Sequence, residues 1–119
     1  MKEHDLLWAM LPEGLEAFFD LTGFEKSDNA LRIVLTEKNI VPSPLPPEYR
    51  NKPVTNTVLN DFLVDDFPVR GLRGEVLLKR RSWKFEGVGK LLTRDPGVCA
   101  EGTKLSKDFA DFLKGMDRI

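Results

Sequence analysis

Residues 70–94 combine side chains that bind phosphate, and they suggest the first chemistry that this sequence could perform. The stretch holds eight Lys or Arg and two Glu, whereas the whole chain has a formal net charge of −1. Cations that neutralise phosphates release counterions and so bind any nucleic acid, and arginine can also pair with guanine through two hydrogen bonds. The candidate DNA-binding side chains here are Arg70, Arg73, Lys79, Arg80, Arg81, Trp83 and Lys84.

The charge of the chain is segregated between its two halves. Residues 1–66 hold 6 basic and 12 acidic side chains, whereas residues 67–119 hold 12 basic and 7 acidic ones. A basic half can offer a docking face to a polyanion whatever the overall charge. Lys104, Lys107 and Lys114 on the last predicted helix repeat the positive charge, so we add Lys104 and Lys107 as candidate contacts to the DNA backbone.

The basic cluster and Trp83 each have an alternative explanation in which they only stabilise the fold. Lys and Arg on an edge strand protect a sheet against aggregation, and a strand tryptophan is more often a core anchor than a platform for a base. For Trp83 we favour packing over stacking. For the basic cluster the additional lysines shift the balance towards binding.

Catalytic constellations are scarce in this sequence. The one histidine, His4, and the one cysteine, Cys99, are far apart, and His4 is expected at the surface of the N-terminal segment. Cys99 is expected as a small buried or half-buried side chain rather than a nucleophile. A single cysteine excludes an intrachain disulfide and a Cys-based zinc cluster. No phosphate-binding glycine loop is present, so we expect neither catalysis nor a cofactor or metal.

One acidic group qualifies that expectation. Asp61, Asp65 and Asp66 are dense enough to hold a magnesium ion or to act as acid and base. The alternative, which we favour, is that these carboxylates lie in a solvated turn before Phe67 and Pro68. The whole turn is expected over residues 65–71.

Hydrophobic spacing predicts an α+β domain. We expect a short helix that ends near Met10, a second helix over residues 12–18, and a β-hairpin whose strands flank the turn formers Ser27, Asp28 and Asn29. Residues 41–57 contain five of the eight prolines and predict an extended, irregular link. This link could be a spacer or a docking peptide, and we favour the spacer.

The remainder predicts a basic antiparallel β-unit and a C-terminal helix. A short strand is expected over residues 58–64, the longest strand over 75–85, and a returning strand over 90–94. Apolar residues near the C-terminus recur at helical spacing, and Ser106 is a plausible N-cap. They are Leu105, Phe109, Phe112, Leu113 and Met116.

These parts are expected to form a single domain over residues 1–119. It comprises a helical segment with hairpin (1–40), the proline-rich link (41–57) and the basic unit with its helix (58–119). No apolar run reaches the length of a membrane span, and the N-terminus does not resemble a signal peptide. We therefore expect a cytoplasmic protein with no membrane contact.

Four segments resemble, in order and spacing, the N-terminal region proteins of bacterial insertion-sequence transposases of the Aon type. They are Leu-Pro-Glu-Gly-Leu (11–15) leading to Phe18 and Phe19, Asp-Phe-Pro-Val-Arg-Gly (66–71), Leu-Lys-Arg-Arg-Ser-Trp (78–83), and residues 101–114. The resemblance spans the chain except for the proline-rich link.

The resemblance implies a non-catalytic protein that recognises the DNA ends of a mobile element, while a separate catalytic subunit transfers the strands. The layout is also similar to larger transposase modules that join a basic strand pair to a zinc ribbon. The ribbon cysteines are absent here, so packing around Trp83 and Phe85 must replace the zinc.

A rival hypothesis is a protein–protein interaction module. The acidic and basic halves could pair between molecules into a homo-oligomer, or the apolar helix face could dock the catalytic transposase subunit.

Overall fold

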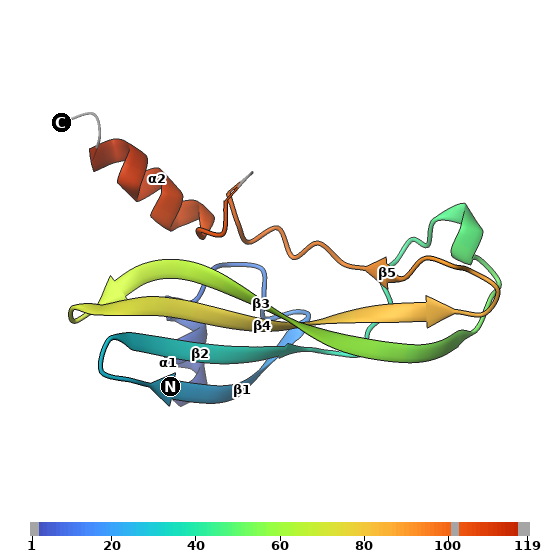
Figure 1. Cartoon of the computed structure of the whole chain (residues 1–119), viewed down its shortest axis with the longest axis horizontal. Helices are drawn as coiled ribbons and strands as arrows, with labels where there is room; N and C mark the ends of the chain where they lie inside the picture. The colour runs from blue at the N-terminus through green and yellow to red at the C-terminus, as the bar shows by residue number, and fades with distance from the viewer. Residues whose placement is uncertain (1–2, 101–102, 117–119) are drawn as a thin grey trace.

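The computed structural model describes residues 3–100 and 103–116. The chain is elongated, 52 Å in its longest dimension, with strands along that axis and a helix at either end of the chain (Figure 1). Its elements are α1 (Glu3–Met10), β1 (Phe19–Lys26), β2 (Ala30–Glu37), a 3₁₀ turn (Pro47–Tyr49), β3 (Val54–Val69), β4 (Leu72–Phe85), β5 (Leu92–Thr93) and α2 (Lys107–Met116).

The strands form one mixed sheet in the order β1-β2-β4-β3, with β5 paired to the end of β4. β2 and β4 run parallel, and the other pairs are antiparallel. The α+β class, the hairpin of β1 and β2 and the antiparallel basic unit are thus confirmed. The parallel pairing that joins the hairpin to the basic unit was not predicted.

Strand β4 changes its neighbour halfway along. Residues 73–79 pair with β2, and residues 82–83 pair with β5 on the same side. β3 accompanies β4 on the other side from Val54 to Val69. The seam between β2 and β5 therefore falls at Arg80 and Arg81, in the middle of the basic stretch.

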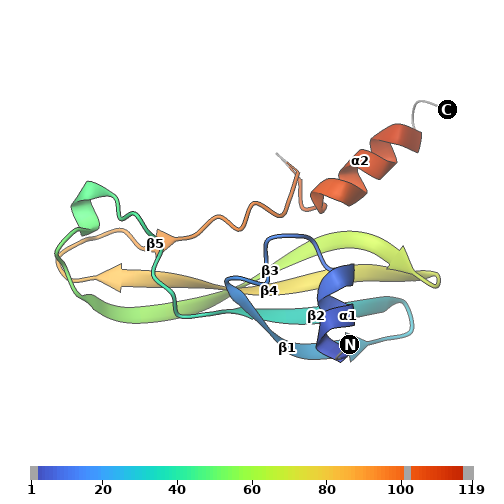
Figure 2. The ribbon, with the colours of Figure 1, turned by 180° about the vertical axis from the view of Figure 1, so that it is seen from behind.

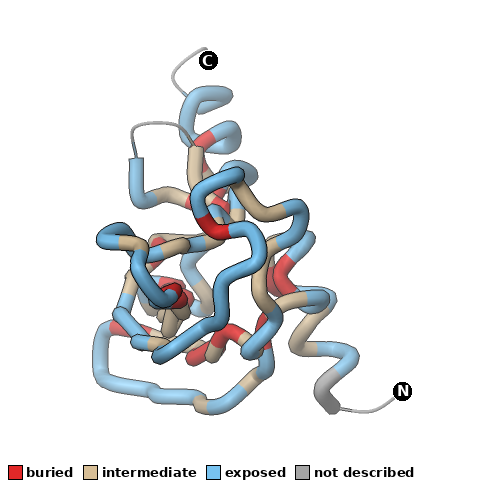
Figure 3. The backbone as a smooth tube through the Cα atoms, turned by 90° about the vertical axis from the view of Figure 1, so that its right-hand side faces the viewer, coloured by how far each residue is buried: buried red, intermediate tan, exposed pale blue. Residues whose placement is uncertain are grey.

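Two hydrophobic clusters stabilise the sheet, one at either side of that seam. The larger one joins Leu11 and Leu15 to Leu35, Val64 and Leu78, all buried. Figure 3 colours the buried positions of the backbone red. The smaller one consists of Tyr49, Trp83 and Phe85, with partly buried residues of the link and of the segment around β5. The expected packing around Trp83 and Phe85 is therefore present.

The predicted helix over residues 12–18 is wrong. These residues form successive turns in which Phe18 and Phe19 donate backbone hydrogen bonds to the Leu15 carbonyl. Gly14 has φ +91°, which no right-handed helix accommodates. The turns allow Leu11 and Leu15 to enter the core, whereas a seven-residue helix would gain little.

The predicted turn over residues 65–71 is wrong for residues 65–69 and right for Arg70 and Gly71. β3 continues to Val69, and the hairpin closes in two residues, Arg70 and Gly71, which both have positive φ. Two positive φ values are typical of the type I′ turns that suit twisted hairpins. Pro68 is tolerated because it lies in an irregular stretch of an edge strand.

The proline-rich link is more ordered than a spacer requires. Tyr49 is buried, its ring lies 5.1 Å from that of Phe85, and its hydroxyl donates to the Lys90 carbonyl at 3.1 Å. Residues 54–57, which were included in the link, belong to β3. The link therefore packs on the smaller cluster and connects β2 to β3.

Helix α2 begins as predicted. The Phe109 N–H donates to the Ser106 hydroxyl oxygen at 3.3 Å, which is an N-cap bond. The Ser106 hydroxyl in turn donates to Asp66 at 2.6 Å. Phe67 on β3 contacts Phe109 and Phe112, but Phe112, Leu113 and Met116 remain exposed. Only the first part of the apolar stripe is covered.

Neither described helix has the length and apolar character to cross a membrane.

Gly74 provides a test of the hairpin geometry. A Cβ at this position would meet the Phe67 carbonyl in the irregular stretch opposite β4. We expect Gly74→Ala to lower the free energy of unfolding by about 1–3 kcal/mol, because overpacking forces the backbone to shift. Urea unfolding of both proteins measures it. Gly89→Ala is the matched control, since nothing lies within 4 Å of its added Cβ. Equal losses in the two variants would contradict the described hairpin.

Candidate nucleic-acid interface

The predicted DNA-binding residues do not form one cluster. Arg70 and Arg73 lie at the tip of the β3–β4 hairpin, whereas Lys84 lies near the other end of β4. At the rise of an extended strand, Arg73 and Lys84 are about 36 Å apart. The basic stretch therefore spreads its charge along the molecule instead of concentrating it at one point.

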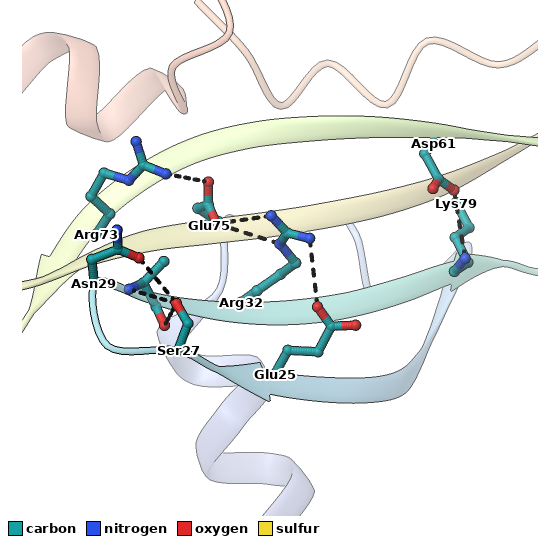
Figure 4. A network of polar contacts seen from close by, with 9 residues as sticks. Glu25, Ser27, Asn29, Arg32, Asp61, Arg73, Glu75 and Lys79 are labelled. Carbon is teal, nitrogen blue, oxygen red and sulfur yellow. Dashed lines mark hydrogen bonds and ion pairs between the residues drawn. The ribbon is translucent and has the colours of Figure 1, made fainter.

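At the hairpin tip the charge is partly compensated. Arg73 is 71% exposed but lies 3.4 Å from the carboxylate of Glu75, which is buried. Glu75 also accepts hydrogen bonds from Arg32, and Arg32 reaches Glu25 on the neighbouring strand (Figure 4). Arg70, in the turn itself, is exposed.

Farther along the same sheet face, Lys79 forms an ion pair with Asp61 at 3.6 Å (Figure 4). Both side chains are substantially exposed, and such pairs contribute little to stability. This face therefore alternates positive and negative side chains from strand to strand.

Arg81 is anchored within the protein. Its backbone N–H donates to the Glu37 carboxylate at 2.9 Å, and its guanidinium donates to the Glu37 carbonyl and to the Thr57 hydroxyl. β2 ends at Glu37, so this carboxylate takes the place of the next ladder acceptor for β4. The guanidinium of Arg81 thus has a structural use whether or not it contacts a ligand.

A residue that sequence reasoning missed completes this junction. Arg94 donates to the buried Glu37 carboxylate at 2.8 Å and to the Ile40 carbonyl at 2.8 Å. Its guanidinium also lies 4.0 Å from the centre of the Phe18 ring. The one available signal was Glu37 itself, an acidic residue at the end of an apolar strand.

Trp83 is a core anchor. Its side chain is fully buried, and its indole N–H donates to the Asn39 side chain at 2.8 Å. The packing alternative is thus confirmed. In this conformation the ring has no free face on which a base could stack.

Arg80, by contrast, borders an open groove. One of its amino groups donates to the Arg94 carbonyl at 2.8 Å, and its guanidinium lies over the Phe62 ring. Its Nε is buried without a hydrogen-bond partner. A buried donor left unpaired in this way is costly.

The groove has a volume of about 510 Å³ and runs between β4 and the segment that leads to α2. Lys107, the first residue of α2, lines the groove together with Arg80, and Lys104 lies exposed three residues earlier. Asp95 is the one acidic lining residue, and its carboxylate accepts the Gly97 N–H at 2.8 Å. The groove thus offers net positive charge to an anion.

The acidic group does not converge. Asp61 pairs with Lys79, and Asp66 accepts the Ser106 hydroxyl. Asp61 and Asp65 are four residues apart on one strand, about 13 Å. Within residues 5–100 and 103–116 no three His, Cys, Asp or Glu side chains are arranged to hold a metal ion. The side chain of His4, like Glu101 and Gly102 of the last motif, lies outside this part of the chain.

Cys99 is half-buried beside the larger cluster, as expected. Desolvation raises the pKa of its thiol above the usual value, nearby Arg80 lowers it by less, and Asp95 and Asp65 add to the rise. The thiolate is therefore disfavoured in the folded protein.

Comparison with known proteins provides no relatives. No family model matches the chain, and no curated protein or solved structure is significantly similar to it.

The half-buried environment of the Cys99 thiol can be tested directly. We expect alkylation of Cys99 at about pH 8 to be several-fold slower in the folded chain than in urea, because the reactive thiolate is scarcer. Because folding raises the pKa of the Cys99 thiol, its contribution to the stability of the folded chain is fully present below the pKa of the unfolded state. That contribution is lost as the pH rises through the pKa of the folded state. Mass spectrometry of the alkylated fraction measures the rate, and equal rates in both states would contradict the burial.

Proposed function

We propose that this chain is a non-catalytic DNA-binding module of a transposition system, acting with a separate catalytic subunit. The observation that carries the proposal is the groove with Arg80 and Lys107 on its walls, next to exposed Lys104. Guanidinium and ammonium groups bind phosphate oxygens through charge-assisted hydrogen bonds. The resemblance in sequence supplies the biological context, the ends of an insertion element.

Within this proposal the basic residues divide into two groups. Arg81 and Arg94 hold the junction at Glu37, so they contribute to binding by shaping the sheet. Lys107 and Arg80 line the groove, and Lys104 is exposed three residues before Lys107. Lys84 and Arg70 extend the positive surface towards the two ends of the hairpin. Phosphate contacts of this kind fix the position of a protein on DNA, whereas contacts to base edges select the sequence.

The sharpest variants are the lysines, because truncating Arg80 or Arg81 also removes contacts within the fold. We expect Lys104→Ala with Lys107→Ala to weaken binding to duplex DNA and to reduce the slope of log affinity against log salt by about 2, one for each lost phosphate contact. Fluorescence anisotropy across about 50 to 200 mM salt measures both quantities.

The matched control replaces Lys26 and Lys38, two cations of the acidic half, with Ala. This variant should retain the affinity and the salt slope of the original chain. An unchanged slope in the Lys104/Lys107 variant would overturn the assignment of the groove.

Comparison of an element-end duplex with a scrambled one tests sequence recognition. Equal binding to the two duplexes would restrict the function to a generic basic surface.

A second candidate function is docking of the catalytic subunit through α2. The observation in its favour is the exposed apolar stripe of Phe112, Leu113 and Met116. If the chain binds no DNA even at low salt, this interaction role becomes the better account.

A further inference from the structure

β3 is the outermost strand of the sheet, and most of its outer edge has no partner in the described chain. Two residues of this edge have their outward backbone groups engaged. The Asp65 N–H donates to the Lys104 carbonyl and the Asp65 carbonyl accepts the Ser106 N–H, both at 2.8 Å, and the Thr57 N–H donates to the side-chain oxygen of the adjacent Asn56 at 2.9 Å. From Val54 to Leu63 the ladder runs to β4 alone. Figures 1 and 2 show this half of β3 along the margin of the molecule, away from α2.

Asp65 reveals which backbone groups the free edge presents. Because Asp65 directs its N–H and carbonyl away from β4, the residues at a spacing of two from it do the same. Leu59, Asp61 and Leu63 therefore offer their N–H and carbonyl groups outwards. Thr57 has the same orientation, but its N–H donates to the Asn56 side chain, a local bond that a further strand would replace. This is the pattern that a further antiparallel strand requires.

This edge has few of the features that usually prevent one edge strand from pairing with another. Lysine, proline and bulges normally prevent edge-to-edge pairing. Residues 57–63 contain no Lys and no Pro, and the irregularities in the β3–β4 register lie outside them, at 54–56 and 66–69. Val58 and Leu59 are 40% and 43% exposed.

We propose that this edge binds the same edge of a second copy of the chain, antiparallel, about a twofold axis at Leu59. The axis sets Leu59 opposite its own equivalent and Thr57 opposite Asp61 of the second copy. The two sheets then become one continuous sheet, with main-chain hydrogen bonds across the axis.

Charge complementarity favours this register. The Arg81 guanidinium donates to the Thr57 hydroxyl at 2.8 Å, so it lies beside the position that Asp61 of the second copy occupies. The twofold axis repeats this pair. An axis at Asp61 would instead set two carboxylates directly opposite each other, which is destabilising. An axis at Thr57 would extend the ladder into the irregular stretch at 54–56.

A disulfide tests the register in the full chain. Residues that exchange both hydrogen bonds across an antiparallel pair have Cα atoms about 5.5 Å apart, within the range of a disulfide. We expect Leu59→Cys to give a covalent dimer on mild oxidation. Thr57→Cys and Leu63→Cys, which do not face themselves, should remain largely monomeric on a non-reducing gel. The unsubstituted chain, whose one cysteine is half-buried, sets the baseline.

Sedimentation equilibrium tests the association without a crosslink. The chain should pass from its monomer mass of 13.5 kDa towards twice that value as concentration rises. Leu59→Lys, which opposes two like charges at the axis, should stay monomeric, whereas the matched Asn60→Lys should retain association. The proposal is overturned if the unsubstituted chain stays monomeric up to its solubility limit, or if the three cysteine variants crosslink equally.

Discussion

The buried carboxylate of Glu37 is the interaction on which the rest of the sheet depends. It is 1% exposed, accepts the Arg81 backbone N–H and pairs with the Arg94 guanidinium at 2.8 Å. A buried charge is tolerated only when it is paired and hydrogen-bonded. These two bonds allow β2 to leave β4 and β5 to replace it without leaving the backbone between them unsatisfied.

This junction changes how the basic strand contributes to function. Arg81 and Arg94 donate hydrogen bonds to Glu37. Trp83 packs in the core beside them, and its indole N–H donates to Asn39. Part of the most basic stretch of the sequence therefore stabilises the fold and is not free to bind a ligand. The charges left for a ligand lie along the groove, at Arg80 and Lys107, and on exposed side chains such as Lys104 and Lys84. We propose the DNA contact for these residues.

Local patterns predicted the local elements. The alternating hairpin and the helix capped by Ser106 depend on neighbours within a few residues, and both are present. The turn at Arg70 and Gly71 was obscured by Asp-Asp-Phe-Pro, which is typical of turns in isolation but continues β3 here.

The parallel register of β2 with β4 connects residues about 43 apart. No local spacing encodes such a contact, so the role of Glu37 and the partner Arg94 could not be found from the sequence. The same holds for the site. Charge identified the basic stretch, and only the tertiary structure separates arginines bonded within the protein from lysines exposed to solvent.

A double-mutant cycle between Glu37 and Arg94, followed by urea unfolding, tests this account most directly. Glu37→Gln and Arg94→Gln should each lower the free energy of unfolding by about 3–5 kcal/mol, because each leaves a buried charge without its partner. The double variant should lose much less than the sum of the two single losses. Additive losses, or single losses below about 1 kcal/mol, would contradict the claim that this pair holds the sheet together.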